Sequence, residues 1–305
     1  MNFKNILEFM VMAKIAESEL VINEDGSIFH LKIKPQELAD KIILVGDPGR
    51  VDLIAGFLES IEFRRASREF VSVTGRYNGQ RISAISTGIG TDNIDIVMTE
   101  LDALVNIDFN TREAKRDLKS LTILRLGTTG GLQSDVPVGS YVMAEVSLGF
   151  DGLMNWYADR EKVADMAMER AFLGHMTWNK HIGDPYFVHS SGKLLKLFEN
   201  DVIKGITISA PGFYGPQGRV VRVPGSMPDM LEELRSFRWG DMKITNLEME
   251  SSAIAALAAH LGHEASTICY VIVNRYSHKA NTDYKSGMGE LIKLALNRLT
   301  EGGNE

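Results

Sequence analysis

The 305-residue chain contains a single cysteine, Cys269, which excludes a disulfide within the chain and a cysteine-based zinc site. This scarcity is typical of proteins from reducing compartments, so we expect a cytoplasmic location. The chain also lacks an apolar run of the roughly 20 residues that a membrane-spanning helix needs. The apolar stretch near the start is interrupted by Glu8, and no signal-peptide cleavage pattern follows it. We therefore expect neither a membrane anchor nor secretion.

Positive charge is scarce as well, because 33 Lys and Arg stand against 40 Asp and Glu, for a net charge of -7. Binding to a nucleic-acid backbone needs clustered basic side chains, so we expect no nucleic-acid partner. The common nucleotide-binding loops are absent, since Gly88 and Gly90 lack the third glycine of the dinucleotide fingerprint. Neither a Gly-x-Ser-x-Gly nor a His-Glu-x-x-His motif occurs. We expect no cofactor and no catalytic metal.

What the sequence does contain is an alternation of short apolar runs with amphipathic helical patterns. The runs Lys41–Val45 and Leu121–Leu126 predict buried strands, and the apolar spacing within Thr91–Asn106 predicts a helix. The dipeptide Asn78-Gly79 between two strand patterns predicts a hairpin, which excludes a purely parallel sheet. The pattern therefore predicts an α/β fold with a central mixed sheet flanked by helices.

We find no repeat, low-complexity tract or linker that would divide the chain. We predict a single domain over residues 23–305 and an appended N-terminal extension, residues 1–22, that is helical over Asn2–Leu20. The charged segment Asp108–Ser120 is predicted to be an exposed insertion between a helix and a strand.

Two glycine-containing segments next to predicted strands offer groups for binding an anion. Gly46–Arg50 (GDPGR) combines glycine amides, a predicted helix start and the bidentate donor Arg50. Arg125–Gly131 (RLGTTGG) brings an arginine near the end of a core strand, where it needs an anionic partner, and Thr128 adds a hydroxyl. Taken alone, each segment also fits an ordinary turn, with a structural ion pair in the second case.

Two further segments offer groups for a sugar and a base. If the strand before them runs to its end, Glu248 and Glu250 point to one face and accept hydrogen bonds from a vicinal diol. The alternative is a helix N-terminus with acidic residues. In the loop Phe213–Arg219, an aromatic ring stacks on a planar base, Gln217 pairs with an amide-like ring edge and Arg219 takes a carbonyl oxygen. By composition alone, that segment is only a turn-rich loop.

Taken together and in order, these segments resemble the nucleoside phosphorylase superfamily, and within it the uridine phosphorylases, from about Ile28 to Leu299. Separate motifs carry the resemblance, and a chance match of all of them in this order is implausible. They are FHL (Phe29–Leu31), GDPGR (Gly46–Arg50), SREF (Ser67–Phe70), STGIG (Ser86–Gly90), RLGTTGG (Arg125–Gly131), NLEMES (Asn246–Ser251) and VIVNR (Val271–Arg275).

The resemblance implies which residues form each part of the site. They are Gly46, Arg50, Arg125, Thr128 and a neighbouring subunit's Arg68 for phosphate; Thr128, Glu248, Met249, Glu250 and the neighbour's His30 for ribose; and Phe213, Gln217 and Arg219 for the base. Of these, Arg219, Gln217, Arg125 and Glu250 are expected to act in catalysis.

The implied reaction is phosphorolysis of a pyrimidine nucleoside, in which uridine and inorganic phosphate become uracil and ribose 1-phosphate. The Phe-x-x-x-Gln-x-Arg spacing favours uracil. Purine enzymes of the superfamily place an aspartate shortly after the strand that ends here in Val-Asn-Arg, where this chain has Asn274, Arg275 and Tyr276. The alternatives are a purine nucleoside phosphorylase, a nucleosidase that uses water, and an inactive nucleoside-binding protein. A structural protein without a ligand is a further alternative.

The resemblance also implies an α/β sandwich around a mixed, barrel-like sheet, in a homo-oligomer. Members form dimers that share active sites, usually three dimers in a hexamer, so we expect at least a dimer. Bacterial uridine phosphorylases often carry Pro-Ser where this chain has Asp92-Asn93. Glu69 and the second of these positions are associated with a structural monovalent cation at the dimer interface, so this cation is left unassigned.

Overall fold

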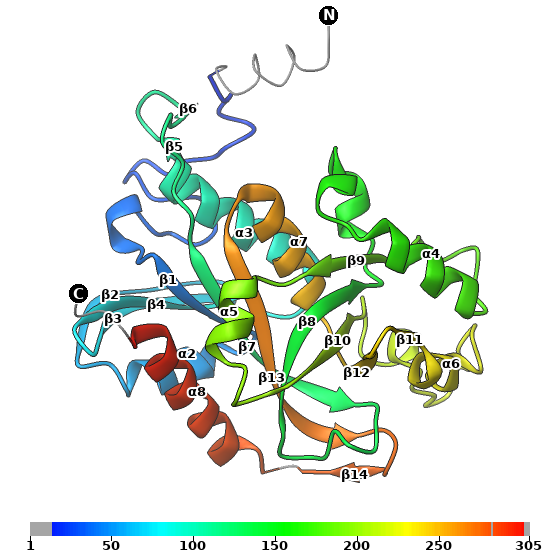
Figure 1. Cartoon of the computed structure of the whole chain (residues 1–305). Coiled ribbons are helices and arrows are strands. Elements are labelled where there is room, and N and C mark those ends of the chain that lie inside the picture. Colours follow the sequence, from blue (N-terminus) through cyan, green and yellow to red (C-terminus); the bar gives the residue numbers. More distant parts are fainter. Residues whose placement is uncertain (1–13, 282, 302–305) are drawn as a thin grey trace, which may run out of the picture.

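The computed structural model describes residues 14–281 and 283–301, in which helices surround one large sheet (Figure 1). The strands of this sheet are β1 (Lys41–Val45), β2 (Ser60–Ser67), β3 (Phe70–Tyr77), β4 (Gln80–Ser86), β7 (Thr122–Gly131), β8 (Tyr141–Gly149), β9 (Tyr186–His189), β10 (Ile203–Ser209), β11 (Arg238–Trp239), β12 (Met242–Glu248), β13 (Glu264–Asn274) and β14 (Lys279–Ala280). The α-helices are α2 (Pro48–Ala55), α3 (Thr91–Asn106), α4 (Met166–His175), α5 (Gly192–Leu197), α6 (Met230–Ser236), α7 (Ser251–Leu261) and α8 (Lys285–Thr300).

Five strands of the sheet close into a barrel. The sheet runs in the order β11-β12-β10-β8-β13-β7-β1-β4-β3-β2, and β12 also pairs with β7. That extra pairing is antiparallel and joins Asn246 to Gly131 and Leu247 to Gly130. Because β12, β10, β8, β13 and β7 form a ring while β1 to β4 extend from it, the predicted mixed, barrel-like α/β fold is confirmed.

Local sequence accounts for the strands that were predicted. The apolar run of β1 is buried, because β1 lies between β4 and β7 and both of its faces are covered. In the predicted hairpin of β3 and β4, Asn78 and Gly79 both have a positive φ, at 49° and 72°. A two-residue loop of this kind matches the right-handed twist of the paired strands, so the dipeptide fixes the register.

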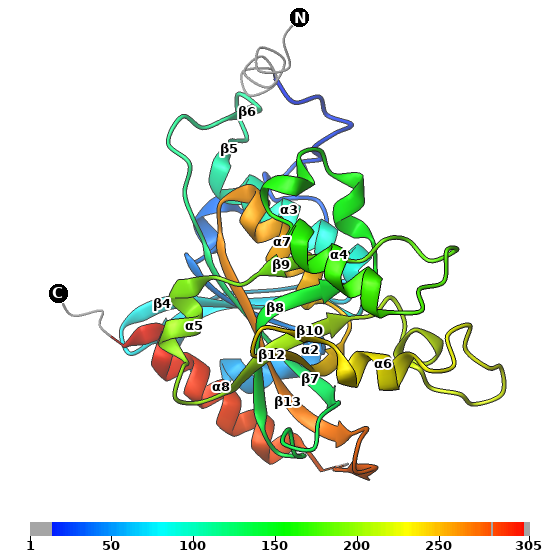
Figure 2. The same cartoon turned by 45° about the vertical axis from the view of Figure 1, so that its right-hand side comes forward.

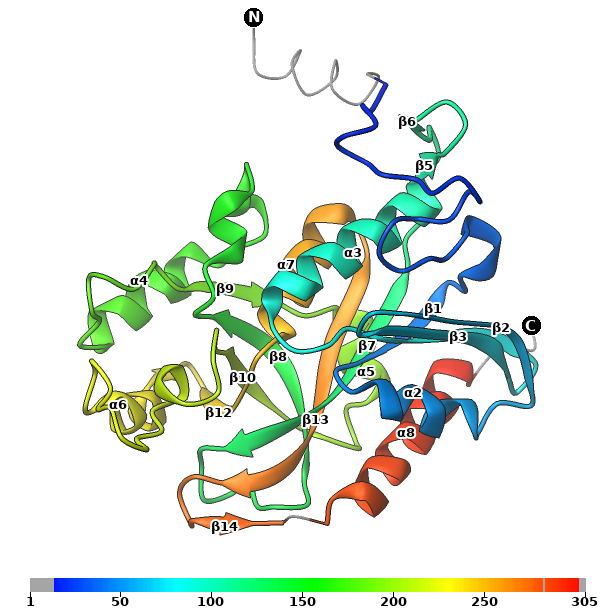
Figure 3. The same cartoon turned by 180° about the vertical axis from the view of Figure 1, so that it is seen from behind.

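Helices cover both faces of the sheet. Figure 1 shows α3 and α7 on one side and α2 and α8 on the other, and the opposite view in Figure 3 agrees. Apolar side chains of α3 and α7, such as Met98 and Leu257, pack against one face, while Ile54 of α2 and Leu296 of α8 pack against the other. Helices α4 and α6 cover the strands β8, β10 and β12 with a third apolar cluster.

Two expectations differ from the structure or fall outside it, and a third agrees with it. The predicted N-terminal helix lies mostly in residues 1–13, which are not among the described residues, and its described part from Lys14 to Leu20 forms turns instead of a helix. The sequence also predicts that the helix beginning after Gly46–Arg50 runs through about Ser60, but this helix ends at Ala55, because Gly56 follows and β2 begins at Ser60. The segment expected to be an exposed insertion is indeed exposed and holds a small separate hairpin, β5 (Ile107–Asp108) with β6 (Glu113–Ala114) (Figure 2).

Within the described part of the chain, no helix combines the length and the apolar character needed to cross a membrane.

Candidate active site

A cavity of about 670 Å³ opens beside the carboxyl ends of β1, β4, β7 and β12. The carboxyl ends of parallel strands are where open α/β sheets present loops and helix N-termini to a ligand. All of the predicted site residues except His30 and Arg68 line this cavity: Gly46, Arg50, Arg125, Thr128, Phe213, Gln217, Arg219, Glu248, Met249 and Glu250. Residues from four separate stretches of sequence therefore meet in one place.

One part of the cavity lining is a buried arginine for which the described residues provide no counter-ion. Arg50 lies in the first turn of α2, is 9 % exposed and lines the cavity. Among the residues that the structure describes, no carboxylate lies within ion-pair distance of Arg50. Burying an unpaired charge is costly, so this part of the cavity favours an anionic ligand.

The backbone next to Arg50 suits the same ligand. Asp47 caps α2 by accepting a hydrogen bond from the amide of Gly49 at 2.9 Å, and Pro48 occupies the first helical position. A side chain at Gly46 would approach the carbonyl oxygen of Gly88 to 3.3 Å, so only glycine keeps this corner open. The helix N-terminus adds its partial positive charge to that of the guanidinium.

A second buried arginine, Arg125, already has two carboxylate partners. Its Nη1 lies 3.0 Å from Oε2 of Glu248, and its Nη2 pairs with Oε2 of Glu250. The Nη1 also donates to Sγ of Cys269 at 3.7 Å, while Nε has no hydrogen-bond partner among the described residues. Burial lowers the pKa of Arg125, but Glu250 and Glu248 raise it by more. The net shift is upward, so this guanidinium stays charged.

The glycine- and threonine-rich segment after Arg125 is a strand, although the sequence suggested a loop. Strand β7 continues to Gly131 because β13 pairs with it along its whole length and β12 pairs with its end. The hydroxyl of Thr129 donates to the carbonyl of Leu247 at 2.5 Å and accepts from Asn246, so it joins β7 to β12. Thr128 lines the cavity and is the threonine left to meet a ligand.

The sequence left open whether Glu248 and Glu250 face a ligand or lie at a helix N-terminus. The structure shows that they do both, since they lie at the start of α7 and line the cavity. Glu248 ends β12, and its carboxylate accepts from the backbone amides of Glu250 at 2.9 Å and of Ser251 at 2.9 Å and 3.1 Å, at the N-terminus of α7. Glu250 accepts from the amide of Gly90 at 2.8 Å and pairs with Arg125. Burial raises the pKa of Glu250, although Arg125 acts in the opposite direction. Both carboxylates also line the cavity.

In another part of the cavity lining, the loop between β10 and α6 presents an aromatic ring, an amide and a guanidinium. The guanidinium of Arg219 lies 3.9 Å from the ring centre of Phe213 and donates to Oε1 of Gln217 at 2.5 Å. Burial lowers the pKa of Arg219, and the neighbouring Arg275 lowers it further. This part of the cavity therefore also favours a ligand that brings negative charge.

Arg275 belongs to the VIVNR motif, but the sequence alone assigns it no role in the site. Its guanidinium donates to the backbone carbonyls of Gln217 at 3.1 Å and Gly218 at 3.4 Å, so it ties the end of β13 to the loop. The side chain of its neighbour Asn274 does not contact this loop but donates hydrogen bonds to the backbone carbonyls of Gln133 and Val136. The motif VIVNR gave the signal, but only the fold shows what Arg275 contacts.

His30 and Arg68 lie outside the cavity of their own chain. His30 is half-buried, and its Nδ1 lies 2.7 Å from Oε1 of Glu100. Because a carboxylate accepts, Nδ1 donates and Nε2 is left for another partner. Arg68 is exposed in the turn between β2 and β3, with φ of 55°. Their contribution to a neighbouring subunit's site stays a prediction.

Asn93, which stands where bacterial uridine phosphorylases often carry serine, makes a hydrogen bond to Glu69. Asn93 donates from Nδ2 to Oε1 of Glu69 at 3.1 Å, and both residues line the cavity. Over residues 14–281 and 283–301, no group of three or more His, Cys, Asp and Glu side chains is placed to hold a metal ion.

Comparison with known proteins agrees with this geometry. The family model of the phosphorylase superfamily matches residues 40–299. The chain superposes on the structure of a Trypanosoma brucei nucleoside phosphorylase that shows uridine phosphorylase activity, with a TM-score of 0.84 and 32 % identity over 92 % of this chain and 99 % of that one. It is 28 % identical to uridine phosphorylase of Thermococcus kodakarensis, over 88 % of this chain and 85 % of the relative. It is also 28 % identical to a DeoD-type purine nucleoside phosphorylase of Anoxybacillus flavithermus, over 88 % and 96 %.

The chain belongs to the phosphorylase superfamily. Within that superfamily it is similar to nucleoside phosphorylases over most of its length, and both uridine and purine enzymes are among them.

Proposed function

We propose that this chain is a nucleoside phosphorylase, a pentosyltransferase that uses inorganic phosphate, and that its nucleoside is a pyrimidine nucleoside such as uridine. A phosphate oxygen attacks C1′ of the ribose, the N-glycosidic bond breaks, and its electron pair goes to N1 of uracil. The products are ribose 1-phosphate and uracil, which takes up a proton. In this proposal phosphate is the co-substrate, and the reaction requires no cofactor. The role is salvage and breakdown of nucleosides in the cytoplasm.

The observation that carries the proposal is Arg50, a buried cavity arginine with no ion-pair partner among the described residues. Phosphate supplies the missing counter-ion, and the amides at Gly46 and the start of α2 supply further donors. Thr128 adds its hydroxyl from β7. Held in this way, phosphate attacks as a positioned nucleophile, which lowers the entropic part of the barrier.

In the same proposal, Glu248, Met249 and Glu250 bind the ribose hydroxyls. Glu250 is held by Gly90 and Arg125, so one of its oxygens is oriented before the sugar arrives. Arg125 is then placed to act on both substrates, since it pairs with Glu248, one of the carboxylates proposed to bind the ribose, and lines the same cavity as Arg50. The phosphate charge stabilises the oxocarbenium character that develops on the ribose.

The base would lie against Phe213, with Gln217 on N3 and O2 and Arg219 on O4. As the glycosidic bond breaks, negative charge moves into uracil. This negative charge stabilises the positive charge of Arg219, which burial and the neighbouring Arg275 both disfavour when the site is empty. Replacing Arg219 by Ala should lower kcat more than it changes the KM for phosphate, and steady-state kinetics with an unchanged kcat would contradict this role.

A neighbouring subunit completes the proposed site. Arg68 would reach the phosphate and His30 the 5′-hydroxyl of a bound nucleoside in the partner, which makes the chain at least a dimer and, by resemblance, a hexamer of three dimers. The exposed position of Arg68 and the free Nε2 left on His30 are compatible with such a contact. Light scattering of the purified chain, with its dependence on concentration, measures the assembly.

The first experiment measures release of free base by ultraviolet absorbance from uridine, thymidine, inosine and adenosine, each with and without phosphate. Uracil release that depends on phosphate is the expected result. Hypoxanthine or adenine release that depends on phosphate would mean that the chain acts on purines, as one group of its relatives does. Release without phosphate would indicate a nucleosidase, and no release from any substrate would indicate a binding protein.

A further inference from the structure

Asp151 is a partly buried carboxylate that does not line the cavity and has no part in the reaction described above. It follows strand β8 and accepts hydrogen bonds from three neutral donors. The hydroxyl of Tyr186 donates to its two oxygens at 2.8 Å and 3.1 Å, the hydroxyl of Ser252 donates to Oδ2 at 2.7 Å, and the amide of Leu153 donates to Oδ1 at 2.8 Å. A carboxylate surrounded in this way is fixed in position.

Ser252 connects Asp151 to the carboxylates of the cavity. It is the second residue of α7, and its backbone amide donates to Oγ of Ser209 at 2.8 Å. The Oγ of Ser209 donates in turn to Oε1 of Glu248 at 2.5 Å, and Glu248 pairs with Arg125. Ser209 and Ser252 are both 0 % exposed, so water does not compete for these bonds. An unbroken chain of contacts therefore runs from Asp151 to the ion pair in the cavity.

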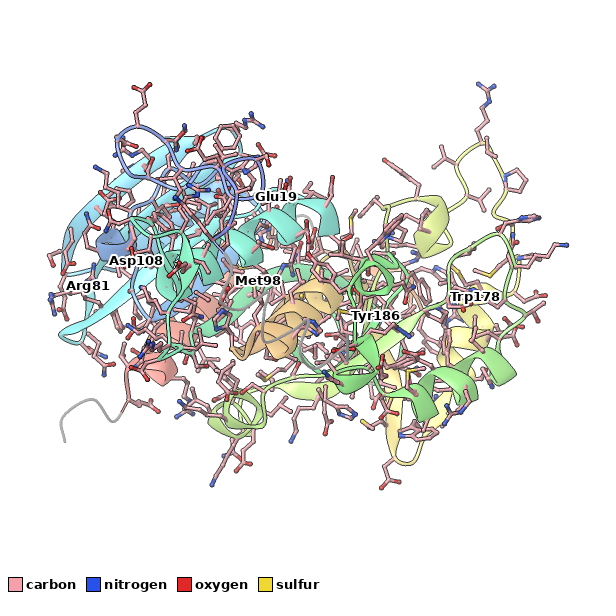
Figure 4. The ribbon with its side chains drawn as sticks, turned by 90° about the horizontal axis from the view of Figure 1, so that it is seen from above. Glu19, Arg81, Met98, Asp108, Trp178 and Tyr186 are labelled. Atoms are coloured by element: carbon pink, nitrogen blue, oxygen red, sulfur yellow. The ribbon has the colours of Figure 1, made fainter. Side chains whose placement is uncertain are left out.

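The topology explains why these side chains meet. Strands β8, β10 and β12 are parallel neighbours, so their carboxyl ends reach the same edge of the barrel. There they supply Asp151, Ser209 and Glu248, and the N-terminus of α7 faces all three. The first turn of a helix has amides without partners inside the helix, and acceptors from these strands take them up. Tyr186, which begins β9, closes the group beside α7 (Figure 4).

We propose that Asp151 is a positioning residue, which holds the first turn of α7 and thereby fixes the segment Glu248–Glu250 against the ribose. This inference rests on the function proposed above. Loss of the bond to Ser252 frees that turn, and Glu248 and Glu250 then move relative to C1′. A misplacement of this kind weakens binding of the sugar hydroxyls more than binding of phosphate. The proposed phosphate ligands Gly46 and Arg50 belong to other elements and keep their positions.

The test uses Asp151→Ala and Ser252→Ala, which remove the same hydrogen bond from its two sides. Glu169→Gln is the matched control, because Glu169 is also a buried carboxylate but pairs with Arg160 and makes no hydrogen bond to the described side chains of Asp151, Ser252 or Glu248. Each protein is assayed for its KM for uridine, its KM for phosphate, and the ratio of kcat/KM for uridine to that for 2′-deoxyuridine. Thermal unfolding is recorded in parallel.

We expect both alanine variants to raise the KM for uridine about tenfold, which corresponds to about 1.4 kcal/mol, and to change the KM for phosphate much less. The preference for uridine over 2′-deoxyuridine should fall, because that preference depends on the position of the carboxylates. Asp151→Asn keeps an acceptor for Ser252 and should restore the KM to within about threefold of the original. The effects of Asp151→Ala and Ser252→Ala should not add, as expected for two residues that share one bond.

The inference is overturned if the alanine variants lower stability like Glu169→Gln but keep the KM for uridine and the preference between the two sugars. If one alanine variant fails to fold, the other one and Asp151→Asn still decide the question. If the unaltered protein releases no base from any nucleoside, the proposed function fails instead, and the role of Asp151 in ribose binding fails with it.

Discussion

Replacing Arg50 by methionine separates the ligand-binding role of this residue from a structural one. Methionine keeps much of the apolar length of the side chain and removes the charge. Two charge-assisted hydrogen bonds from a guanidinium to phosphate contribute about 3 kcal/mol together. Their loss should raise the KM for phosphate about 100-fold. The KM for the nucleoside should change little, because Arg50 lies at the far end of the cavity from Phe213 and Arg219 in the proposed arrangement.

Although Arg50→Met should weaken phosphate binding, we expect it not to destabilise the fold. Arg50 is 9 % exposed and has no ion-pair partner among the described residues, so its charge is desolvated without compensation when phosphate is absent. We expect Arg50→Met to unfold at the same temperature as the original protein or higher, when no phosphate is present. Phosphate at about 100 times its Kd stabilises the original protein by about 2.7 kcal/mol, whereas a variant whose Kd equals that concentration gains only about 0.4 kcal/mol.

Steady-state kinetics with varied phosphate and thermal unfolding with and without phosphate measure both effects. Arg160→Met provides the control, because Arg160 pairs with Glu169 at 2.6 Å outside the cavity. That variant should lose stability and keep its KM for phosphate. If Arg50→Met left the KM for phosphate unchanged, or lowered the unfolding temperature as far as Arg160→Met, the assignment of Arg50 to an anion would be wrong.

Three further predictions concern the surroundings of Arg125. Arg125→Met leaves Glu248 and Glu250 buried without a cation and should cost about 3–5 kcal/mol in a denaturant titration; a loss below about 1 kcal/mol would contradict the pairing. Gly127→Ala should lower activity, since its Cβ would lie 2.2 Å from Nη1 of Arg125 and 2.9 Å from Sγ of Cys269, and unchanged kinetics would refute this crowding. Burial raises the pKa of Cys269 to about 12, so its thiol stays protonated at pH 8 and should resist iodoacetamide until the protein unfolds; alkylation of the folded protein, followed by mass spectrometry, would show otherwise.

Some elements of the fold follow from local sequence. The apolar run of β1 and the helix α3 were predicted with the bounds that the structure has, because each carries its own periodicity. The edge strand β2 was not predicted, since most of its residues are exposed and its pairing with β3 is not visible in the local sequence. The strand β7 was predicted to end too early, because glycine and threonine carry no apolar pattern and only the partners on either side extend it.

The sequence by itself determined the fold class and which side chains the motifs single out as candidates for the site, since arginine, glutamate and glutamine are recognisable in their motifs. It did not determine how these side chains meet. Arg125 and Glu250 lie 125 positions apart, and only closure of the barrel between β7 and β12 brings them together. Arg125 thereby gains two carboxylate partners, whereas Arg50 in α2 has no ion-pair partner among the described residues. Tertiary structure decided this difference, because the electrostatic environment of a charge depends on neighbours in space and not in sequence.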